Sequence, residues 1–222
     1  MEQQQDDYII SSVFPTPIYK TNWDYNLWER EEGEIEDIAK GELVQVGALD
    51  YHSKNLFLFN TKLKKLKEFC ELHVEKYVKE VLSPAEDVNF YITSSWLNVV
   101  KPGGGICAHT HSNSIISGSF YSKTVEEDKI TFYDPNRQRR EARNSIEIAS
   151  KFSETSPLQP YSENLNGMEY AVFDGDLLLF PSWLMHGVMP NKRATQDRFS
   201  ISFNVFVKGT LGSKGGLDEL II

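Results

Sequence analysis

The sequence predicts a mainly β fold, a sheet-on-sheet barrel of the jelly-roll type with N-terminal helices packed on one sheet. Short segments rich in β-branched and aromatic residues, separated by turn residues, recur from residue 88 to residue 207. Helical periodicity is confined to the part of the chain before residue 88. Six or more strands that follow two helical segments indicate a barrel that encloses one core and is supported by helices.

The first part of the chain is predicted to be a helical buttress, over residues 13–87. Residues 1–12 are expected to be disordered, because they begin with a polar run at the terminus. Residues 13–19 contain two prolines, which favour an extended segment. An acidic surface helix is expected over residues 27–40. The 3.6-residue spacing of apolar side chains predicts a longer helix that ends at about Leu82, with Asn60-Thr61 as its N-cap.

Residues 88–207 are predicted to be the jelly-roll core of a single domain that spans residues 13–207. The expected strands are 88–100, 106–110, 115–123, 129–133, 170–173, 176–180 and 198–207. Lys101-Pro-Gly-Gly-Gly105 is a strong turn signal. The polar stretch 138–165 is expected to be a lid or specificity loop. Residues 208–222 contain four glycines, and we expect a C-terminal tail that is flexible as far as its apolar residues.

Composition limits the kinds of partner. The formal net charge of −9 argues against general nucleic-acid binding, since such binding neutralises phosphates. No apolar run is long enough to cross a membrane, and the acidic start of the chain does not resemble a signal peptide, so we expect a cytoplasmic protein. A homodimer is compatible with the sequence. One basic cluster is either a solvated loop or a docking patch for an acidic substrate: Arg137, Arg139, Arg140 and Arg143.

The spacing of three histidines indicates a metal site. His109 and His111 are two residues apart, so a β-strand would point both imidazoles to one face. His186 follows 75 residues later in an apolar segment, where an unpaired ring would be costly unless something coordinates it. Converging imidazoles suit a divalent transition metal. Arg198, 12 residues further on, offers a planar fork for a carboxylate such as that of a dicarboxylic acid.

Each of these features also has a simpler interpretation. His109 and His111 could be two exposed strand histidines. The alternation at residues 198–204 places Arg198 on the same face as three other polar residues, either inside the barrel around an anion or on an outer polar face. His52 and His73 are expected to be ordinary histidines without a metal. Cys107 is expected to be a small buried side chain, although its thiolate could also ligate metal.

The chain resembles the iron(II)- and 2-oxoglutarate-dependent oxygenase superfamily, and more narrowly a family of oxygenases with an H-x-H metal motif. The resemblance covers residues 13–207 and implies a double-stranded β-helix, the cupin-like form of the jelly roll. It rests on Phe14-Pro-Thr-Pro-Ile-Tyr19, Ser95-Trp-Leu-Asn-Val99, His109-Thr-His111, Ser117-Gly-Ser-Phe-Tyr121, Phe132-Tyr-Asp-Pro135, Gly175-Asp-Leu-Leu-Leu-Phe-Pro-Ser-Trp-Leu-Met-His-Gly-Val188 and Arg198-Phe-Ser-Ile-Ser-Phe-Asn204.

The resemblance implies that Fe(II) is held by histidines and that 2-oxoglutarate and O2 are co-substrates. The implied metal ligands are His109, His111 and His186, and no other catalytic side chain is expected. The implied residues for 2-oxoglutarate are Arg198, Ser200, Asn98 and Tyr121. The implied reaction couples oxidative decarboxylation of 2-oxoglutarate to hydroxylation of an unknown substrate, either a protein side chain or a metabolite. Candidates for aromatic pocket walls are Trp96, Phe120, Trp183 and Phe203, although packing in the core is the more common role for each of these side chains.

The chain departs from the superfamily pattern at His111, where a carboxylate is usual. A third imidazole would leave the iron site one unit more positive; alternatively His111 does not bind, and water or another anion takes its place. Two rival functions remain. One is a cupin-like metalloenzyme that uses the three histidines without 2-oxoglutarate, and the other is a non-catalytic jelly-roll binding module. Arg198 discriminates among them, because only the oxygenase needs a cationic anchor.

Overall fold

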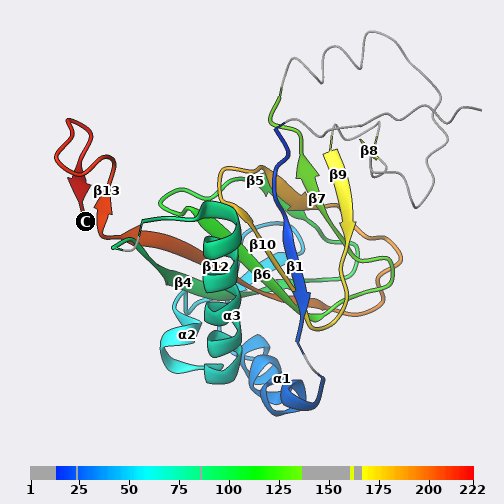
Figure 1. Cartoon of the computed structure of the whole chain (residues 1–222). Coiled ribbons are helices and arrows are strands. Elements are labelled where there is room, and N and C mark those ends of the chain that lie inside the picture. Colours follow the sequence, from blue (N-terminus) through cyan, green and yellow to red (C-terminus); the bar gives the residue numbers. More distant parts are fainter. Residues whose placement is uncertain (1–13, 24, 86, 137–160, 163–166) are drawn as a thin grey trace, which may run out of the picture.

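The computed structural model describes residues 14–23, 25–85, 87–136, 161–162 and 167–222. Two antiparallel sheets face each other, and helices lie against the outer face of the larger sheet (Figure 1). The prediction of a mainly β jelly roll is therefore confirmed. Residues 1–12, the basic cluster and most of residues 138–165 lie outside the described residues.

The larger sheet has seven strands and includes three from the segment predicted as a helical buttress. Its spatial order is β1 (Tyr19–Asn22), β10 (Asp176–Pro181), β6 (Ile116–Lys123), β12 (Arg198–Lys208), β4 (Asn89–Val100), β3 (Asp50–Ser53) and β2 (Leu43–Gln45). The central strand β12 pairs with β4 over its whole length and with β6 on its other side. The N-terminal residues thus complete both edges of the sheet.

The smaller sheet has five strands among the described residues. They are, in order, β5 (Ile106–His109), β11 (His186–Val188), β7 (Lys129–Tyr133), β9 (Gly167–Ala171) and β8 (Tyr161–Ser162). The C-terminal segment, for which a flexible tail was expected, contains two paired strands, β13 (Thr210–Leu211) and β14 (Leu220–Ile221). Backbone hydrogen bonds in both directions between Gly209 and Ile222 close this hairpin.

Side chains alternate strictly between two environments along the central strands. On β12, Phe199, Ile201, Phe203 and Val205 pack toward the helices. On β10, Leu177 and Leu179 join that helix-side core, whereas Leu178 and Phe180 join a second core that also contains residues of the smaller sheet. Because a strand turns successive side chains to opposite faces, this alternation assigns every polar residue between them to the space between the sheets.

The second helical segment ends at Leu82, as predicted, but it begins differently from the prediction. The helices are α1 (Tyr25–Ala39), α2 (Leu58–Thr61) and α3 (Lys64–Tyr77), with a π-helical turn over Val78–Leu82. The predicted N-cap at Asn60-Thr61 is wrong, since both residues lie inside α2. The carboxylate of Glu31 in α1 instead accepts the backbone N–H groups of Lys65 and Leu66 at 2.9 Å. A carboxylate from another helix thus satisfies free N–H groups at the start of α3.

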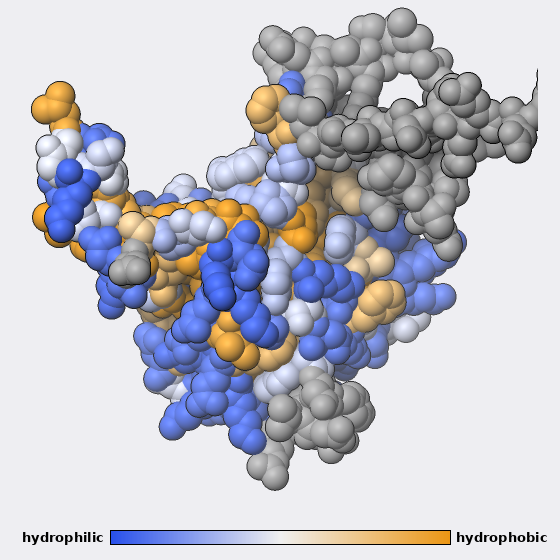
Figure 2. Space-filling model, viewed as in Figure 1, coloured by the Kyte–Doolittle hydropathy of each residue, from blue (hydrophilic) through white to orange (hydrophobic). Residues whose placement is uncertain are grey.

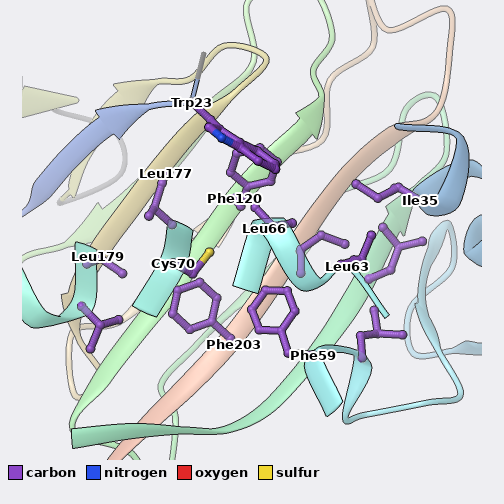
Figure 3. Packing of buried hydrophobic residues seen from close by; sticks show 14 of the residues in the cluster. Trp23, Ile35, Phe59, Leu63, Leu66, Cys70, Phe120, Leu177, Leu179 and Phe203 are labelled. Carbon is purple, nitrogen blue, oxygen red and sulfur yellow. The ribbon is translucent and has the colours of Figure 1, made fainter. Parts of the chain in front are cut away.

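The largest core lies between the helices and the seven-stranded sheet. Figure 3 shows Leu63, Leu66 and Cys70 facing Phe203 and Leu177 across this layer. Phe203 packs directly over Gly118, its cross-strand partner on β6. A β-carbon at Gly118 would overlap the Phe203 ring, so this glycine is required for close approach rather than for backbone freedom.

The surface over the helices is mainly hydrophilic, whereas apolar surface appears on the C-terminal hairpin (Figure 2). Leu217, Leu220 and Ile221 of this hairpin are exposed. Within the described ranges, no helix is both long enough and apolar enough to span a membrane.

We predict that Gly118→Ala destabilises the protein by about 3 kcal/mol, because the added methyl group overpacks the core against Phe203. The matched control is Gly33→Ala on α1, where nothing lies within 4 Å of the new β-carbon. This second substitution should stabilise the protein by about 1 kcal/mol, since alanine favours helix. Urea denaturation of both variants measures the two free energies of unfolding. Equal effects of the two substitutions would contradict the packing at Gly118.

Candidate functional site

Three histidines converge between the sheets, as the sequence predicted. His109 is the last residue of β5 and is the cross-strand partner of His186, the first residue of β11. The Nε2 atoms of His109 and His111 lie 3.1 Å apart, and one nitrogen from each of the three rings lies within 4.8 Å of the other two. An octahedral metal with bonds of about 2.1 Å places adjacent ligand atoms about 3.0 Å apart, which matches the first distance.

The strand predicted over residues 106–110 is present as β5, but His111 lies beyond its end, so strand alternation alone does not bring the two imidazoles together. β5 ends at His109, and the chain bends at residues 112–113, directly after His111. The backbone N–H of His111 donates to the carbonyl of Ser182 at 3.0 Å. The hydroxyl of Ser182 in turn contacts those of Ser114 and Ser117 at 2.7 and 2.9 Å. A serine network therefore holds the turn that brings the second imidazole to the first.

Each imidazole is oriented by an oxygen on its Nδ1 side. The Nδ1 atoms of His109 and His186 contact the backbone carbonyls of Cys107 and Leu184, both at 2.8 Å. The Nδ1 of His111 contacts the Oδ1 of Asn204 at 2.6 Å. Because these oxygens only accept, each Nδ1 carries the proton, and each Nε2 presents a lone pair. Lone pairs so close together repel each other unless a cation lies between them.

Burial keeps two of these rings neutral. Burial among Phe180 and its neighbours lowers the pKa of His186 to about 3, despite the hydrogen bond to Leu184. Burial also lowers the pKa of His111, whose ring stacks against Trp96. Both imidazoles are therefore deprotonated at neutral pH, which is the state that binds a metal.

The predicted metal ligands and the predicted 2-oxoglutarate residues line the same cavity. It has a volume of about 660 Å³ and opens between the two sheets. Asn98, Ser200 and Tyr121 are cross-strand partners on β4, β12 and β6, so they form one row across the larger sheet. Arg198 lies at the start of β12, on the same face as Ser200. The polar face predicted for residues 198–204 therefore points inward.

Arg198 is held by a carboxylate that the sequence did not suggest. Its Nε donates to both carboxylate oxygens of Asp128, at 3.0 and 2.8 Å, and the two side chains are only 4% and 2% exposed. Burial raises the pKa of Asp128, against the opposing effect of Arg198. One terminal nitrogen, Nη1, donates to the Ser200 hydroxyl at 3.3 Å. The ion pair thus fixes the guanidinium through Nε and leaves its far end toward the cavity.

Tyr121 has a buried hydroxyl without a hydrogen-bond partner of normal geometry among the described residues. Burial raises the pKa of Tyr121 to about 12, although the nearby Arg198 and Ser119 act in the opposite direction. The Arg198 guanidinium lies 5.1 Å from the centre of the Tyr121 ring. An unpaired buried hydroxyl costs free energy, so a polar partner at this point is favoured.

Of Asn98 and the four candidate aromatic residues, only Asn98 and Trp96 line the cavity. The Asn98 side chain accepts from the Trp96 indole at 3.0 Å and donates to the Ser202 hydroxyl at 2.8 Å. Phe120 and Phe203 belong to the helix-side core, which is the ordinary packing role expected for such side chains, and Trp183 is 57% exposed.

The remaining histidines and Cys107 stand outside the metal cluster. Cys107 is exposed, so its prediction as a buried side chain is wrong, and it is not part of the metal-binding group. His73 packs in the helix layer, with its Nδ1 2.6 Å from the Tyr19 hydroxyl, as an ordinary histidine. His52 lines the cavity but does not belong to the metal cluster.

A comparison with family models gives one match. The model of the family "Putative 2OG-Fe(II) oxygenase" matches residues 94–204, which include the three histidines, Arg198 and Asn204. The chain belongs to this family. It is therefore an oxidoreductase of the class that uses Fe(II) and 2-oxoglutarate, and the sequence-based resemblance is confirmed. No curated protein matches the chain in sequence.

Solved structures support the fold. HygX from Streptomyces hygroscopicus, with nickel, 2-oxoglutarate and hygromycin B bound, is 13% identical, with 86% of this chain and 83% of that chain covered and a TM-score of 0.56. A prolyl-4-hydroxylase from Pseudomonas putida is 13% identical, with 85% and 92% covered and a TM-score of 0.54. The epimerase SnoN from nogalamycin biosynthesis is 9% identical, with 87% and 81% covered and a TM-score of 0.59. These likenesses show a shared jelly-roll architecture.

We predict that His111→Ala lowers Fe(II) affinity by about 100-fold or more, because it removes one of three converging nitrogens. Asn204→Ala should lower the same affinity by about tenfold, since it frees the His111 ring to rotate. His52→Ala is the matched control, a cavity-lining histidine outside the cluster, and should leave the affinity unchanged. Anaerobic competition with a chelator measures all three values. Unchanged affinity in His111→Ala would make this a two-histidine site.

Proposed function

We propose that the chain is an Fe(II)- and 2-oxoglutarate-dependent dioxygenase whose iron is held by His109, His111 and His186. The reaction consumes O2 and couples oxidative decarboxylation of 2-oxoglutarate to hydroxylation of a second substrate. Family membership supplies the class of activity. The observation that carries the assignment of residues is the cavity itself, where three metal-competent nitrogens share one space with a guanidinium and an unpaired buried hydroxyl.

The donor set fits a first-row metal such as Fe(II). Imidazole nitrogen suits iron, and all three rings have the tautomer that leaves Nε2 free. Across the described residues, no carboxylate joins the cluster. Three neutral ligands leave the full charge of the metal on the site, which the dianionic keto acid then neutralises. Bound iron supplies the chemistry of O2 activation, which no side chain here can perform.

Arg198, Ser200 and Tyr121 are proposed to bind the distal carboxylate of 2-oxoglutarate. The far end of the guanidinium offers N–H donors, and Asp128 fixes its direction. The Ser200 hydroxyl lies beside it, and the Tyr121 hydroxyl gains the partner it otherwise lacks. Asn98 forms the adjacent wall of the pocket, where its own hydrogen bonds hold Trp96 and Ser202 in place.

Apolar side chains keep the neighbouring space dry. Ile130 and Phe180 line the cavity next to the metal cluster, and Phe180 packs on His186 with ring centres 4.6 Å apart. Exclusion of water strengthens every charge interaction inside the site and limits side reactions.

A cupin-like metalloenzyme without a keto acid is the second candidate. The observation that favours it is the Arg198–Asp128 ion pair. Asp128 already neutralises Arg198, so the arginine does not require a bound anionic ligand. Binding of 2-oxoglutarate separates the two functions.

We further propose a cytoplasmic protein that does not bind nucleic acid in general. The net charge of −9 and two free cysteines support this assignment. The primary substrate is either a protein side chain or a metabolite, and a homodimer is compatible with the apolar C-terminal hairpin.

We predict that Tyr121→Phe lowers 2-oxoglutarate affinity by about tenfold or more, since it removes a hydrogen bond to a charged group. Without 2-oxoglutarate, the same variant should be as stable as the wild type or more stable, because the lost hydroxyl is unpaired. Tyr91→Phe, at an exposed tyrosine on β4, should change neither quantity. Calorimetric titration and urea denaturation measure the two effects. A loss of stability in the ligand-free Tyr121→Phe protein would show that its hydroxyl is already satisfied.

The decisive test is the paired substitution Arg198→Met with Asp128→Asn. Arg198→Met alone would leave a buried carboxylate unpaired at a cost of about 3–5 kcal/mol, so the double variant keeps the site neutral. Anaerobic addition of Fe(II) and 2-oxoglutarate should give a weak charge-transfer band in the green with the wild type. The double variant should keep its Fe(II) affinity and lose the band. Undiminished 2-oxoglutarate affinity in the double variant would refute the role of Arg198 as anchor.

A further inference from the structure

One carboxylate faces the cavity without belonging to the metal or keto-acid residues. Asp50 lies on β3 and is 8% exposed. It is the only acidic side chain among the described residues that line the cavity. Asp50 pairs with Val100 across the strands, and Val100 pairs with Arg198. Asp50 and Arg198 therefore share the inner face of the sheet, two strand spacings or about 10 Å apart.

The Asp50 carboxylate forms neither a hydrogen bond nor an ion pair in the described part of the chain. Burial raises its pKa, while the charges of His52, His109 and Arg198 act in the opposite direction. Its β-carbon and one carboxylate oxygen lie close to Gly47, beneath the turn between β2 and β3. Backbone hydrogen bonds hold this turn, because the N–H groups of Val46 and Gly47 both donate to the Asp50 carbonyl.

The charges around the cavity do not balance without a further cation. Arg198 is neutralised by Asp128. In the proposed function, iron with three neutral imidazoles is neutralised by the dianionic keto acid. Asp50 then remains as one uncompensated negative charge that faces the loaded cavity. The net charge of the whole chain, −9, favours the approach of cations and opposes that of anions.

The mouth of the cavity adds an apolar surface beside this charge. Val46, Leu49 and Met189 line the cavity and are also exposed to solvent. The backbone N–H of Gly103, next to Leu49, donates to the Asn191 carbonyl at 3.2 Å and so joins this part of the mouth to the segment that follows Met189. A volume of 660 Å³ lies within the range of about 300–1,000 Å³ that is typical of sites for drug-sized ligands. The cavity therefore has room for a second molecule beside the keto acid.

We propose that Asp50 binds an ammonium group of the primary substrate, and that the apolar body of the substrate contacts Val46, Leu49 and Met189 at the mouth. The primary substrate is thus an amine with an aliphatic portion, such as a lysyl side chain or a small alkylamine. This inference rests on the proposed function for the reaction that follows binding. The recognition step itself depends only on Asp50 and the mouth of the cavity.

His52 is the one other titratable side chain that β3 contributes to the cavity. Its Nδ1 contacts the Ser53 carbonyl at 2.8 Å, so it donates there rather than to Asp50. Within the described chain, no ion pair joins His52 and Asp50. The carboxylate is consequently left for an external donor.

The test uses three probes with the same carbon skeleton: hexylamine, hexan-1-ol and hexanoate. Each is titrated by calorimetry into the full-length protein, both alone and loaded with redox-inert Mn(II) and 2-oxoglutarate. The wild type should bind hexylamine at least about tenfold more tightly than hexan-1-ol in both forms, because a charge-assisted hydrogen bond adds roughly 1.5 kcal/mol or more. In the form loaded with 2-oxoglutarate, where the keto acid occupies Arg198, hexanoate should bind more weakly than hexan-1-ol.

Asp50→Asn should bring the ratio of hexylamine to hexan-1-ol affinity close to one. Asparagine has the same shape, and the carboxylate accepts no hydrogen bond in the described residues, so the fold should be retained; circular dichroism checks this. Asp37→Asn is the matched control, because it removes the same charge from the exposed surface of α1. It should keep the full preference for the amine.

Two results would overturn the proposal: equal affinity of the wild type for hexylamine and hexan-1-ol, or an undiminished preference in Asp50→Asn. Failure of 2-oxoglutarate to bind the Mn(II) protein would instead refute the proposed function. In that case the titrations of the unloaded protein still decide the role of Asp50.

Discussion

The alternation of side chains along β12 is the constraint on which the rest of the site depends. Its odd-numbered residues from Phe199 to Val205 fill the core beneath the helices, so Arg198 and Ser200 must face the cavity. A slip of one residue would turn the guanidinium into the apolar core and the phenylalanines into the cavity. Because β12 pairs with β4 and β6 on both sides, the same register also fixes Asn98 and Tyr121. The helix-side core therefore positions the polar row without touching it.

Placing this polar row between two sheets has a cost that the fold offsets only in part. Asp128 neutralises the buried charge of Arg198. Removing either side chain would leave the other as a buried, unpaired ion. Among the described residues, the Tyr121 hydroxyl is buried without a hydrogen bond, and the Asp50 carboxylate faces the cavity without a hydrogen bond or an ion pair. Unsatisfied groups of this kind destabilise a folded protein, and they persist at sites where a ligand completes them. The two groups lie at different places in one cavity, as expected for a site that takes two ligands.

The sequence predicted those features that follow from strand periodicity and missed those that depend on turns and loops. The inward polar face of residues 198–204 follows from alternation and was predicted correctly, whereas the convergence of His186 with His109 and His111 was predicted from the histidine pattern and the family resemblance. Asp128 was missed because it follows Glu126 and Glu127 in a short polar turn, where a carboxylate normally indicates a solvated surface. Asp50 was missed because β2 and β3 are short and carry no alternating pattern. The start of α3 was misplaced because its capping carboxylate, Glu31, comes from another helix, and local sequence contains no signal for such a contact.

A histidine at position 111, where a carboxylate is usual, affects how strongly the binding of the metal and the binding of the keto acid depend on each other. All three imidazoles are oriented by neutral oxygens, namely the carbonyls of Cys107 and Leu184 and the amide of Asn204. An aspartate at position 204 would add a negative charge next to the metal site, through its hydrogen bond to the His111 ring. Asparagine orients the ring without adding charge. The protein thus contributes no anion to a bound dication within the described residues. The exchangeable ligand must supply the compensating charge, so the metal and a dianionic keto acid should strengthen each other's binding more than in a site with a built-in carboxylate.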